Sequence, residues 1–430
     1  MFIQAGCRFP TCPGFEQGGL VTRFAPSDLG ELRDVIGAAL AAEEPLELLA
    51  GGTKRELGRP LQLPRTLDLS KLAGIRDYQP SELILTAGAA TPLAEIEDTL
   101  APVRQMLAFE PPNWVELFAL PAPAAGRATL GGVLACNLSG PRRIKAGAAR
   151  DHFLGFRGVS GRAEVFKAGG KVVKNVTGYD LPKLMAGSYG TLAALEEVTV
   201  RVLPCPETVC TVVLCGLDPR AATDRLTAAL ASPHEISGAA YLPPAVPATP
   251  ASLTGTRGVT ALRLEGPSPS VAFRRERLLA ELASDCESTI LDFETSDGFW
   301  RAVRDVVPLA QPADRAIWRI SVAPSRGAEI GDALSRGLDA DWYIDWGGGL
   351  LWVAVAEAED GGNRLIRATI RGEDGRGTGH ATLIRGSTSL RRTVPVFEPQ
   401  PPPLASLAAR VKDSFDPRRI LNPGRMVEEW

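Results

Sequence analysis

The sequence predicts an α+β protein in which a glycine-rich N-terminal domain precedes a domain built around an antiparallel sheet. Glycine-rich segments lie at 51–54, 128–132, 137–151 and 169–192. From Cys205 onward the chain alternates short apolar strands with helices, and it does so twice in the order βαββαβ. With 430 residues, 45% of them hydrophobic, the chain can bury two or three cores. We therefore predict domains at 1–205 and 206–396 and a C-terminal segment at 397–430.

The N-terminal domain is expected to begin with a capped helix and to continue with short buried strands. Asp28 precedes the helical pattern LGELRDVIGAALAAEE, and LELLAGGT indicates a strand that runs into a turn. TLDLS and LILTAG are further short strands, and Thr91 and Pro92 begin the helix PLAEIEDTL. The segment from 106 to 132 is predicted to be rich in loops.

The second domain is expected to contain two split, ferredoxin-like units. The first has strands TVCTVVLCGL, ISGAAYL, VTALRLEG and STILDF and helices PRAATDRLTAAL and VAFRRERLLAEL. The second follows the helix FWRAVRDVV and has strands RAIWRISVAP, DWYIDWGG, LLWVAVAE and HATLIRG and helices RGAEIGDALSRGL and NRLIRATIRG. Their strands are expected to form one continuous antiparallel sheet backed by helices. The prolines between 399 and 403 should then interrupt the pattern before a short helix, SLAARVKDSF.

The run GGKVVKNVTGYDLPKLMAGSYGTL at 169–192 has two interpretations. Gly178, Gly187 and Gly190 remove side chains where the backbone turns tightly or lies against a flat ligand. Hydroxyl groups accompany them at Thr177, Ser188 and Thr191. The run therefore indicates either contact with a large cofactor or tight turns within the fold.

The glycine-rich segments, taken in order, resemble the FAD-binding domain of the vanillyl-alcohol oxidase/p-cresol methylhydroxylase (PCMH) type. The motifs MLAFEPP, ATLGG, SGPRR, VVKNVTGYDL, TGHATLIRG and FDPRRILNPGRM are similar to those of the FAD-binding E subunits of bacterial glycolate oxidases. The resemblance implies a two-subdomain PCMH-type FAD-binding domain, a cap domain, and a C-terminal tail that returns to the FAD domain. A tail that only packs against that domain is the alternative.

Candidate cofactor residues come from the glycine loops and from the resemblance. Successive N–H groups of Gly51, Gly52 and Thr53 can form an anion-binding nest, although the loop is not a GxGxxG fingerprint. Lys54 either adds charge there or is solvated. The resemblance places Thr129, Gly132, Ser139 and Gly140 along the pyrophosphate and ribityl chain, with Gly190 and Thr191 near the same cofactor. The complete set of candidates is Gly51, Gly52, Thr53, Lys54, Thr129, Gly131, Gly132, Ser139, Gly140, Arg150, Asp151, Gly187, Gly190 and Thr191.

Charged residues near these loops allow more than one role. Arg150 and Asp151 form either an ion pair that orients a loop or, by family analogy, a pair close to the flavin. Arg142 and Arg143 either bind an acidic group or phosphate or form a solvated basic turn.

The chain contains only three histidines, His152, His234 and His380. Many relatives attach FAD covalently through a histidine in or near the first glycine loop, which has none here, so non-covalent FAD is expected. Oxidation of a 2-hydroxy acid requires a base. The candidates are His380, for which a structural role in a strand is the alternative, and His152, which either bonds Asp151 or packs a loop. Catalytic residues otherwise remain unassigned.

Composition excludes several other classes of function. The net charge of −3 gives no basic surface for nucleic acid. The seven cysteines form no CxxC pair, so a zinc or iron–sulfur site is not expected, although Cys7 and Cys12 could pair in an oxidising setting. The sequence shows neither a membrane span nor a signal peptide, which favours the cytoplasm.

The resemblance implies an FAD-binding subunit of a complex that oxidises glycolate to glyoxylate. It would work with a catalytic flavoprotein D subunit and an iron–sulfur F subunit, and electrons would leave FAD through another chain. The complex is expected in the cytoplasm or at the inner membrane through its partners. Two alternatives stay open: a self-sufficient FAD-dependent 2-hydroxy acid dehydrogenase, and a non-catalytic assembly subunit. Trp342, Trp346 and Trp352 either anchor a partner or fill the core.

Overall fold

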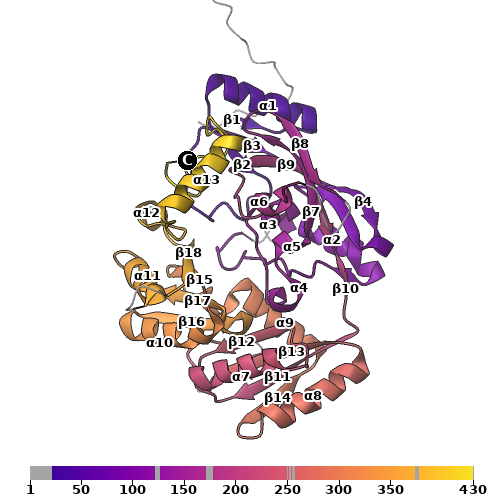
Figure 1. Cartoon of the computed structure of the whole chain (residues 1–430), viewed down its shortest axis with the longest axis vertical. Helices are drawn as coiled ribbons and strands as arrows, with labels where there is room; N and C mark the ends of the chain where they lie inside the picture. Colours follow the sequence, from indigo (N-terminus) through magenta and orange to yellow (C-terminus); the bar gives the residue numbers. More distant parts are fainter. Residues whose placement is uncertain are drawn as a thin grey trace, which may run out of the picture.

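The computed structural model describes residues 22–121, 126–170, 178–248, 250, 253, 257–372 and 377–429. Figure 1 shows an N-terminal half, formed by elements β1 to β10, against a cap formed by elements β11 to β18. The C-terminal helices α12 (Thr388–Thr393) and α13 (Pro402–Phe415) leave the cap and lie beside the N-terminal half. The mixture of helices and antiparallel sheets confirms the predicted α+β class.

The N-terminal half contains two principal sheets. A parallel sheet has the strand order β1-β3-β2, and an antiparallel sheet has the order β4-β5-β9-β7-β8. The short strands β6 and β10 pair with each other. The strands are β1 (Thr22–Phe24), β2 (Glu47–Leu49), β3 (Arg65–Asp68), β4 (Ile75–Gln79), β5 (Ile84–Gly88), β6 (Gln105–Met106), β7 (Phe153–Ser160), β8 (Val165–Gly169), β9 (Ala193–Arg201) and β10 (Leu203–Pro204). The helices are α1 (Leu29–Ala42), α2 (Leu93–Leu100), α3 (Leu130–Ala135), α4 (Arg143–Ala146), α5 (Ala149–His152) and α6 (Leu181–Met185).

Helix α1 illustrates how the sequence pattern sets the local structure. The Asp28 side chain accepts a hydrogen bond from the N–H of Glu31 and so caps the first turn, as predicted. Leu32, Ile36 and Ala39 recur at helical spacing and are buried in one cluster with β3 and the C-terminal tail. The helix therefore covers the small parallel sheet.

The cap is one eight-stranded antiparallel sheet, as predicted. Its order is β14-β11-β13-β12-β16-β17-β15-β18, which is two ferredoxin-like units joined through β12 and β16. The strands are β11 (Thr208–Cys215), β12 (Gly238–Leu242), β13 (Val259–Gly266), β14 (Glu287–Leu291), β15 (Ala316–Val322), β16 (Ala340–Asp345), β17 (Leu350–Val355) and β18 (Gly379–Arg385). The helices are α7 (Pro219–Ala231), α8 (Ser268–Leu282), α9 (Phe293–Asp305), α10 (Gly327–Gly337) and α11 (Asn363–Arg371).

The two faces of the cap sheet serve different cores. Leu262 and Leu264 point into the cluster that α7, α8, α10 and α11 cover, whereas Ala261 belongs to the cluster shared with the N-terminal half. This alternation is the period of a β-strand, so each strand contributes to both layers. The cap sheet is therefore held between its own helices and the N-terminal half.

Trp342, Trp346 and Trp352 fill these cores. They are 4%, 6% and 4% exposed, respectively. Trp342 packs under the helices, whereas Trp352 packs edge to face against Trp114 of the N-terminal half, with ring centroids 5.7 Å apart. The tryptophans thus serve the core, and the alternative of an exposed partner surface is wrong.

The C-terminal tail contacts the N-terminal half. Leu46 and Leu421 form a parallel bridge, and Ile420 and Leu421 lie in the core cluster under α1. Helix α13 begins at Pro402, earlier than the predicted start after Pro403, because proline is tolerated in the first turn of a helix. The tail therefore brings residues after 415 back to β2.

The remaining sequence-based expectations concern domain boundaries, a disulfide, a membrane span and a metal site. The boundaries at 205/206 and 396/397 stay predictions, although the chain does pass from β10 to β11 between Pro204 and Thr208. Cys7 and Cys12 lie outside the described residues. Within those residues no helix is both long and apolar enough to cross a membrane, and no group of three His, Cys, Asp or Glu side chains could hold a metal ion.

Candidate functional site

A crevice opens where the two sheets of the N-terminal half meet helix α3 and the C-terminal tail. It encloses about 850 Å³ of empty space, counting the solvent at its mouth. The residues that line it are Leu48, Leu49, Ala50, Gly51, Gly52, Thr53, Lys54, Arg55, Leu57, Leu69, Ala89, Ala90, Thr129, Gly131, Gly132, Ala135, Cys136, Tyr189, Gly190, Ala193, Leu195, Asn422 and Arg425.

The loop at 51–54 offers backbone donors to this crevice. Gly52 has a φ of +76°, a region that glycine enters at little cost. Gly51 lies so close to Arg127 that a Cβ would fall 1.6 Å from the Arg127 carbonyl oxygen. In the described part of the chain, the N–H groups of residues 51, 52, 53 and 54 donate to no protein acceptor. Successive free N–H groups form a nest for an anion.

Lys54 adds positive charge to the same loop. Its side chain lines the crevice, and Nζ donates a hydrogen bond to Thr53 Oγ1 at 3.3 Å. Burial lowers the pKa of Lys54, while the neighbouring Cys136 thiol opposes that shift. Burial also raises the pKa of Cys136 to about 11, although Lys54 opposes this shift. The thiol is therefore protonated at neutral pH, and Lys54 lies in the crevice wall rather than on a solvated surface.

Helix α3 supplies a flat wall of small residues. Thr129 caps its N-terminus, since Oγ1 accepts a hydrogen bond from Gly132 N–H at 3.2 Å. A Cβ on Gly131 would fall 2.6 Å from the Ala89 carbonyl oxygen, so glycine is needed for the helix to approach the end of β5. Such a surface suits an aromatic ring system, which requires broad apolar contact.

The C-terminal tail closes another side of the crevice. Asn422 Oδ1 accepts a hydrogen bond from Leu48 N–H at 2.8 Å, and Asn422 Nδ2 donates to the Tyr189 carbonyl at 2.9 Å. Arg425 donates to the carbonyls of residues 55 and 57 at 2.9 and 3.1 Å. The tail thus joins β2 to the turn before β9 and fixes both walls of the crevice.

The predicted cofactor residues divide into two groups. The crevice wall contains Gly51, Gly52, Thr53, Lys54, Thr129, Gly131, Gly132 and Gly190. Ser139, Gly140, Arg150, Asp151, Gly187 and Thr191 are not among its lining residues. Thr177 lies outside the described residues.

The second group supports the elements around the crevice. Ser139 Oγ accepts a hydrogen bond from Ala149 N–H at 2.8 Å, and the Asp151 carboxylate accepts one from Ala148 N–H at 2.9 Å, so both stabilise the start of α5. The Thr191 carbonyl accepts a hydrogen bond from Lys412 of the tail at 2.7 Å. These residues therefore hold neighbouring segments in place from behind the crevice wall.

Gly140 and Gly187 require glycine for different reasons. Gly140 N–H donates to the Phe109 carbonyl at 2.9 Å, and a Cβ on Gly140 would meet Glu110 at 2.8 Å. Gly187 has a φ of +85° and its N–H donates to the Leu134 carbonyl at the end of α3. Gly140 is therefore needed for packing, whereas Gly187 is needed for its positive φ, since a Cβ there would lie 3.6 Å from Asn137 Cβ.

Arg142 joins the N-terminal half to the cap. Its guanidinium bonds Glu110 at 2.6 Å and Glu265 of β13 at 2.6 Å. Glu110 also pairs with Arg263 of the same strand at 2.9 Å. Although burial opposes the shift, Arg263 and Arg142 hold the pKa of Glu265 at about 2. Arg142 thus binds acidic groups of the protein itself.

Both ring nitrogens of His152 face backbone carbonyl oxygens, and because burial lowers its pKa, the neutral ring donates to one of them. His152 is fully buried, with Nδ1 at 3.2 Å from the Arg201 carbonyl and Nε2 at 2.9 Å from the Ala146 carbonyl. Its ring also packs against Phe109 at a centroid distance of 5.5 Å. Asp151 is bonded to the backbone instead, so His152 occupies a packing position. His380, in contrast, lies on β18 and is exposed.

The lining residues fit the FAD that the sequence led us to expect. The loop at 51–54 has free donors and a cation for a diphosphate, and α3 offers a flat wall for a ring. Reasoning from the sequence missed Cys136, Tyr189, Asn422 and Arg425. The glycine next to Tyr189 and the predicted return of the tail were the available signals, whereas nothing in the sequence pointed to Cys136.

Comparisons with known proteins agree with this site. A family model described as FAD binding domain matches residues 22–169. The chain is similar to the glycolate oxidase subunit GlcE of Escherichia coli (strain K12), with 33% identity over 93% of this chain and 97% of that protein. It is also 40% identical to the glycolate oxidase subunit GlcD of Bacillus subtilis (strain 168), over 21% of this chain and 20% of that protein.

A solved structure shares the fold. The crystal structure of p-cresol methylhydroxylase with substrate bound superposes with a TM-score of 0.67 at 14% identity, over 95% of this chain and 89% of that one. The fold is therefore of the PCMH type. Together with the family model, this identifies FAD as the cofactor.

Proposed function

Because the chain belongs to the family of the glycolate oxidase subunit GlcE, we propose that it is the FAD-binding subunit of a complex that oxidises glycolate to glyoxylate. The observation that carries this proposal is the row of free N–H groups at 51–54, facing a crevice of small residues. When bound, FAD would supply the acceptor for the hydride of a 2-hydroxy acid. The protein's own residues bind and orient it.

The residues divide this task by position. The N–H groups of Gly51, Gly52 and Thr53, with the Lys54 ammonium, would bind the diphosphate. The wall of α3 with Gly190 would hold the remaining length of the cofactor. The supporting residues behind the wall, which are Ser139, Gly140, Arg150, Asp151, Gly187 and Thr191, would position these segments. This division is supported by the hydrogen bonds and close approaches of the glycine loops.

We further propose that FAD is held without a covalent bond. Neither the glycine loop nor the rest of the crevice lining contains a histidine. Cys136 is in the lining, but its raised pKa keeps the thiol protonated, and a protonated thiol is a poor nucleophile. Acid precipitation of the purified chain should therefore release all of its flavin into the supernatant, and flavin retained in the pellet would contradict this.

Two partner subunits complete the proposed complex. The catalytic flavoprotein D subunit would bring the base for the hydroxyl proton, and the iron–sulfur F subunit would carry electrons onward from FAD. Within the described residues of this chain, no set of His, Cys, Asp or Glu could ligate a metal, and His152 is buried with both ring nitrogens facing backbone carbonyls. The chain is therefore expected to need its partners for turnover.

The visible absorption spectrum of the chain purified alone tests the proposal. We expect a flavin spectrum that stays oxidised when glycolate is added without oxygen and that bleaches once the partner subunits are added. Bleaching by the isolated chain would instead show a self-sufficient 2-hydroxy acid dehydrogenase. A colourless chain that still assembles with its partners would show an assembly subunit and overturn the proposal.

A further inference from the structure

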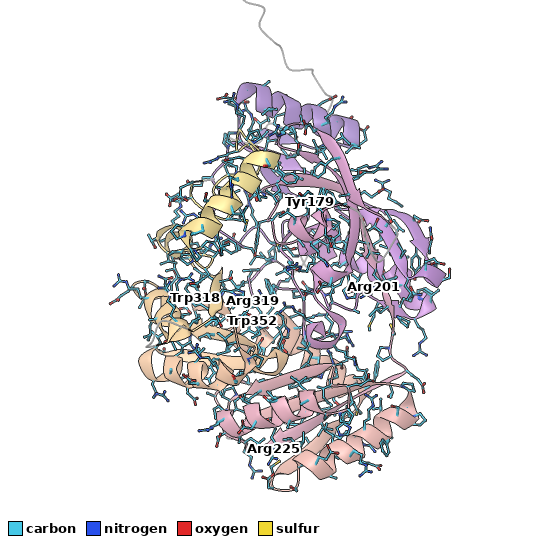
Figure 2. The ribbon with its side chains drawn as sticks, viewed as in Figure 1. Tyr179, Arg201, Arg225, Trp318, Arg319 and Trp352 are labelled. Atoms are coloured by element: carbon cyan, nitrogen blue, oxygen red, sulfur yellow. The ribbon has the colours of Figure 1, made fainter. Side chains whose placement is uncertain are left out.

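The face of the cap sheet that meets the N-terminal half carries two arginines with opposite surroundings. Arg263 on β13 is saturated, because it pairs with Glu110 at 2.9 Å and donates to the Ser237 carbonyl at 3.1 Å. Arg319 on β15 lies on the same face, since its neighbours Trp318 and Ile320 point to the helices. Figure 2 shows Arg319 and Trp352 where the cap meets the N-terminal half. The two residues are direct neighbours in the sheet, because Arg319 of β15 pairs with Trp352 of β17.

In the part of the chain that the structure describes, the acidic group that acts on Arg319 is Asp345, which forms no ion pair with it and whose pKa burial raises to about 7. Arg319 forms neither an ion pair nor a hydrogen bond there. Burial, reinforced by the positive charge of Arg143, lowers its pKa to about 10. Part of the Arg319 surface reaches solvent, but a guanidinium that is desolvated to this degree is normally paired with an anion.

Arg143, on α4 of the N-terminal half, is an exposed residue that approaches the same indole ring, and Asp151 is the acidic group that acts on it. Its guanidinium carbon lies 4.1 Å from the centroid of the Trp346 ring, and that of Arg319 lies 5.1 Å from the same centroid. Neither the ion pairs nor the hydrogen bonds of the described residues include the Arg143 side chain. Two like charges therefore contact one indole ring and act on each other, and an anion bound near both would relieve their repulsion.

Two further polar side chains lie beside the arginines. His380 on β18 is paired with Ser321, so it lies diagonally across from Arg319 on the same face. Burial and the charge of Arg319 lower the pKa of His380, which keeps the imidazole neutral and able to donate one N–H. Tyr189, which lines the crevice, interacts electrostatically with Arg319. The cluster thus adjoins the cofactor site.

We propose that Arg143, Arg319 and His380 form a binding site for a small carboxylate anion. The planar guanidinium matches a carboxylate in a two-bond geometry, and the Trp346 ring gives the anion's carbon skeleton an apolar wall. Arg319 is partly exposed and Arg143 is exposed, so an anion can reach them from solvent. The choice of a carboxylate of hydroxy-acid size rests on the proposed function; the need for an anion rests on the cluster alone.

Oxalate is a suitable probe because it has two carboxylates and no hydrogen on carbon to lose by oxidation. The full-length chain with its flavin would be titrated with oxalate by calorimetry. We expect Arg319→Gln and Arg143→Gln each to weaken binding by about tenfold or more, since each removes a charged hydrogen-bond donor. Arg319→Lys keeps the positive charge but cannot donate two parallel hydrogen bonds to one carboxylate. It should therefore reduce oxalate affinity less than Arg319→Gln does.

Arg225→Gln is the matched control. Arg225 pairs with Asp285 and lies at the far end of the cap from Arg319 (Figure 2), so oxalate binding should change less than twofold. Absence of oxalate binding to a flavin-containing wild-type chain would overturn the site and leave the proposed function standing. Equal binding of inorganic phosphate, lost in the same variants, would overturn the carboxylate assignment. Oxalate binding to a chain without flavin would instead refute the proposed function alone.

Discussion

The buried ion pair between Lys412 and Asp416 gives the sharpest prediction about how the tail is held. Both side chains have no exposed surface, and Lys412 Nζ lies 2.6 Å from Asp416 Oδ2. Nζ also donates to the carbonyls of Thr191 at 2.7 Å and Leu421 at 3.1 Å. The carboxylate of Asp416 accepts hydrogen bonds from the N–H groups of Ile420 and Leu421 at 3.0 and 2.8 Å. One lysine thus joins α13, the tail and the segment before β9.

Lys412→Met should destabilise the protein by about 3–5 kcal/mol. The substitution keeps most of the side-chain volume but leaves the Asp416 carboxylate buried without a counter-charge, and this uncompensated charge sets the cost. The double variant Lys412→Met with Asp416→Asn removes that charge and keeps an acceptor for one of the two N–H groups. It should recover about 2 kcal/mol, so the two substitutions should be strongly non-additive.

Equilibrium unfolding in urea, followed by tryptophan fluorescence, measures both effects. Lys145→Met serves as the control because Lys145 and Glu235 form an exposed pair, with side chains 50% and 64% exposed. Such a pair contributes only about 0–1 kcal/mol. Lys412→Met should also weaken FAD binding, because Lys412 holds the tail at Leu421, and Asn422 and Arg425 of the same tail line the crevice. A loss below about 1 kcal/mol, or additive single and double effects, would refute the reasoning.

Two further predictions concern the loop and the cap. Gly52→Ala and Gly74→Ala both force alanine to a positive φ, +76° and +97° respectively, and neither new methyl group meets a close contact. Each substitution should therefore cost about 1 kcal/mol of stability. In a fluorescence titration with FAD, only Gly52→Ala should also weaken binding. Equal FAD affinity of the two variants would exclude the loop from the site. Burial raises the pKa of Asp345 to about 7, whereas the pKa of an aspartate in the unfolded chain is about 3.9. Between these two pH values the folded state keeps a proton that the unfolded state loses. The free energy of unfolding therefore falls by about 1.4 kcal/mol for each pH unit of increase in this range. Asp345→Asn should remove this contribution, so urea midpoints at about pH 5 and about pH 8 should lie closer together than in the wild type, and an unchanged difference would contradict this.

The cap could be predicted from the sequence because its strands carry apolar residues at period two and alternate with amphipathic helices. In the N-terminal half, β5 could be predicted as the apolar run LILTAG, but β7 and β9 of the same sheet could not. β9 contains Glu196, which is 4% exposed and is neutralised by Arg157 of β7 at 2.9 Å. β7 contains Gly158, where a Cβ would fall 2.6 Å from the Ala194 carbonyl oxygen. A buried charge and a glycine both argue against a strand until the neighbouring strand is known.

The site shows a similar division between local and distant determinants. The loop at 51–54 could be predicted, because glycines act within a few residues, whereas α3 begins at Leu130 at the end of a segment expected to be rich in loops. Asn422 reaches Leu48 and Tyr189 only because the tail folds back over the N-terminal half. Arg142 is committed to Glu110 and Glu265, a pairing that no local pattern reveals. Side chains whose partners are far away in the sequence therefore stayed ambiguous.

A crystal structure of the chain with FAD tests the central claim most directly. We expect the diphosphate oxygens to accept hydrogen bonds from the N–H groups of residues 51–54, with the ring system against the wall formed by α3. Those four N–H groups bonded only to water, with the diphosphate elsewhere, would contradict the account.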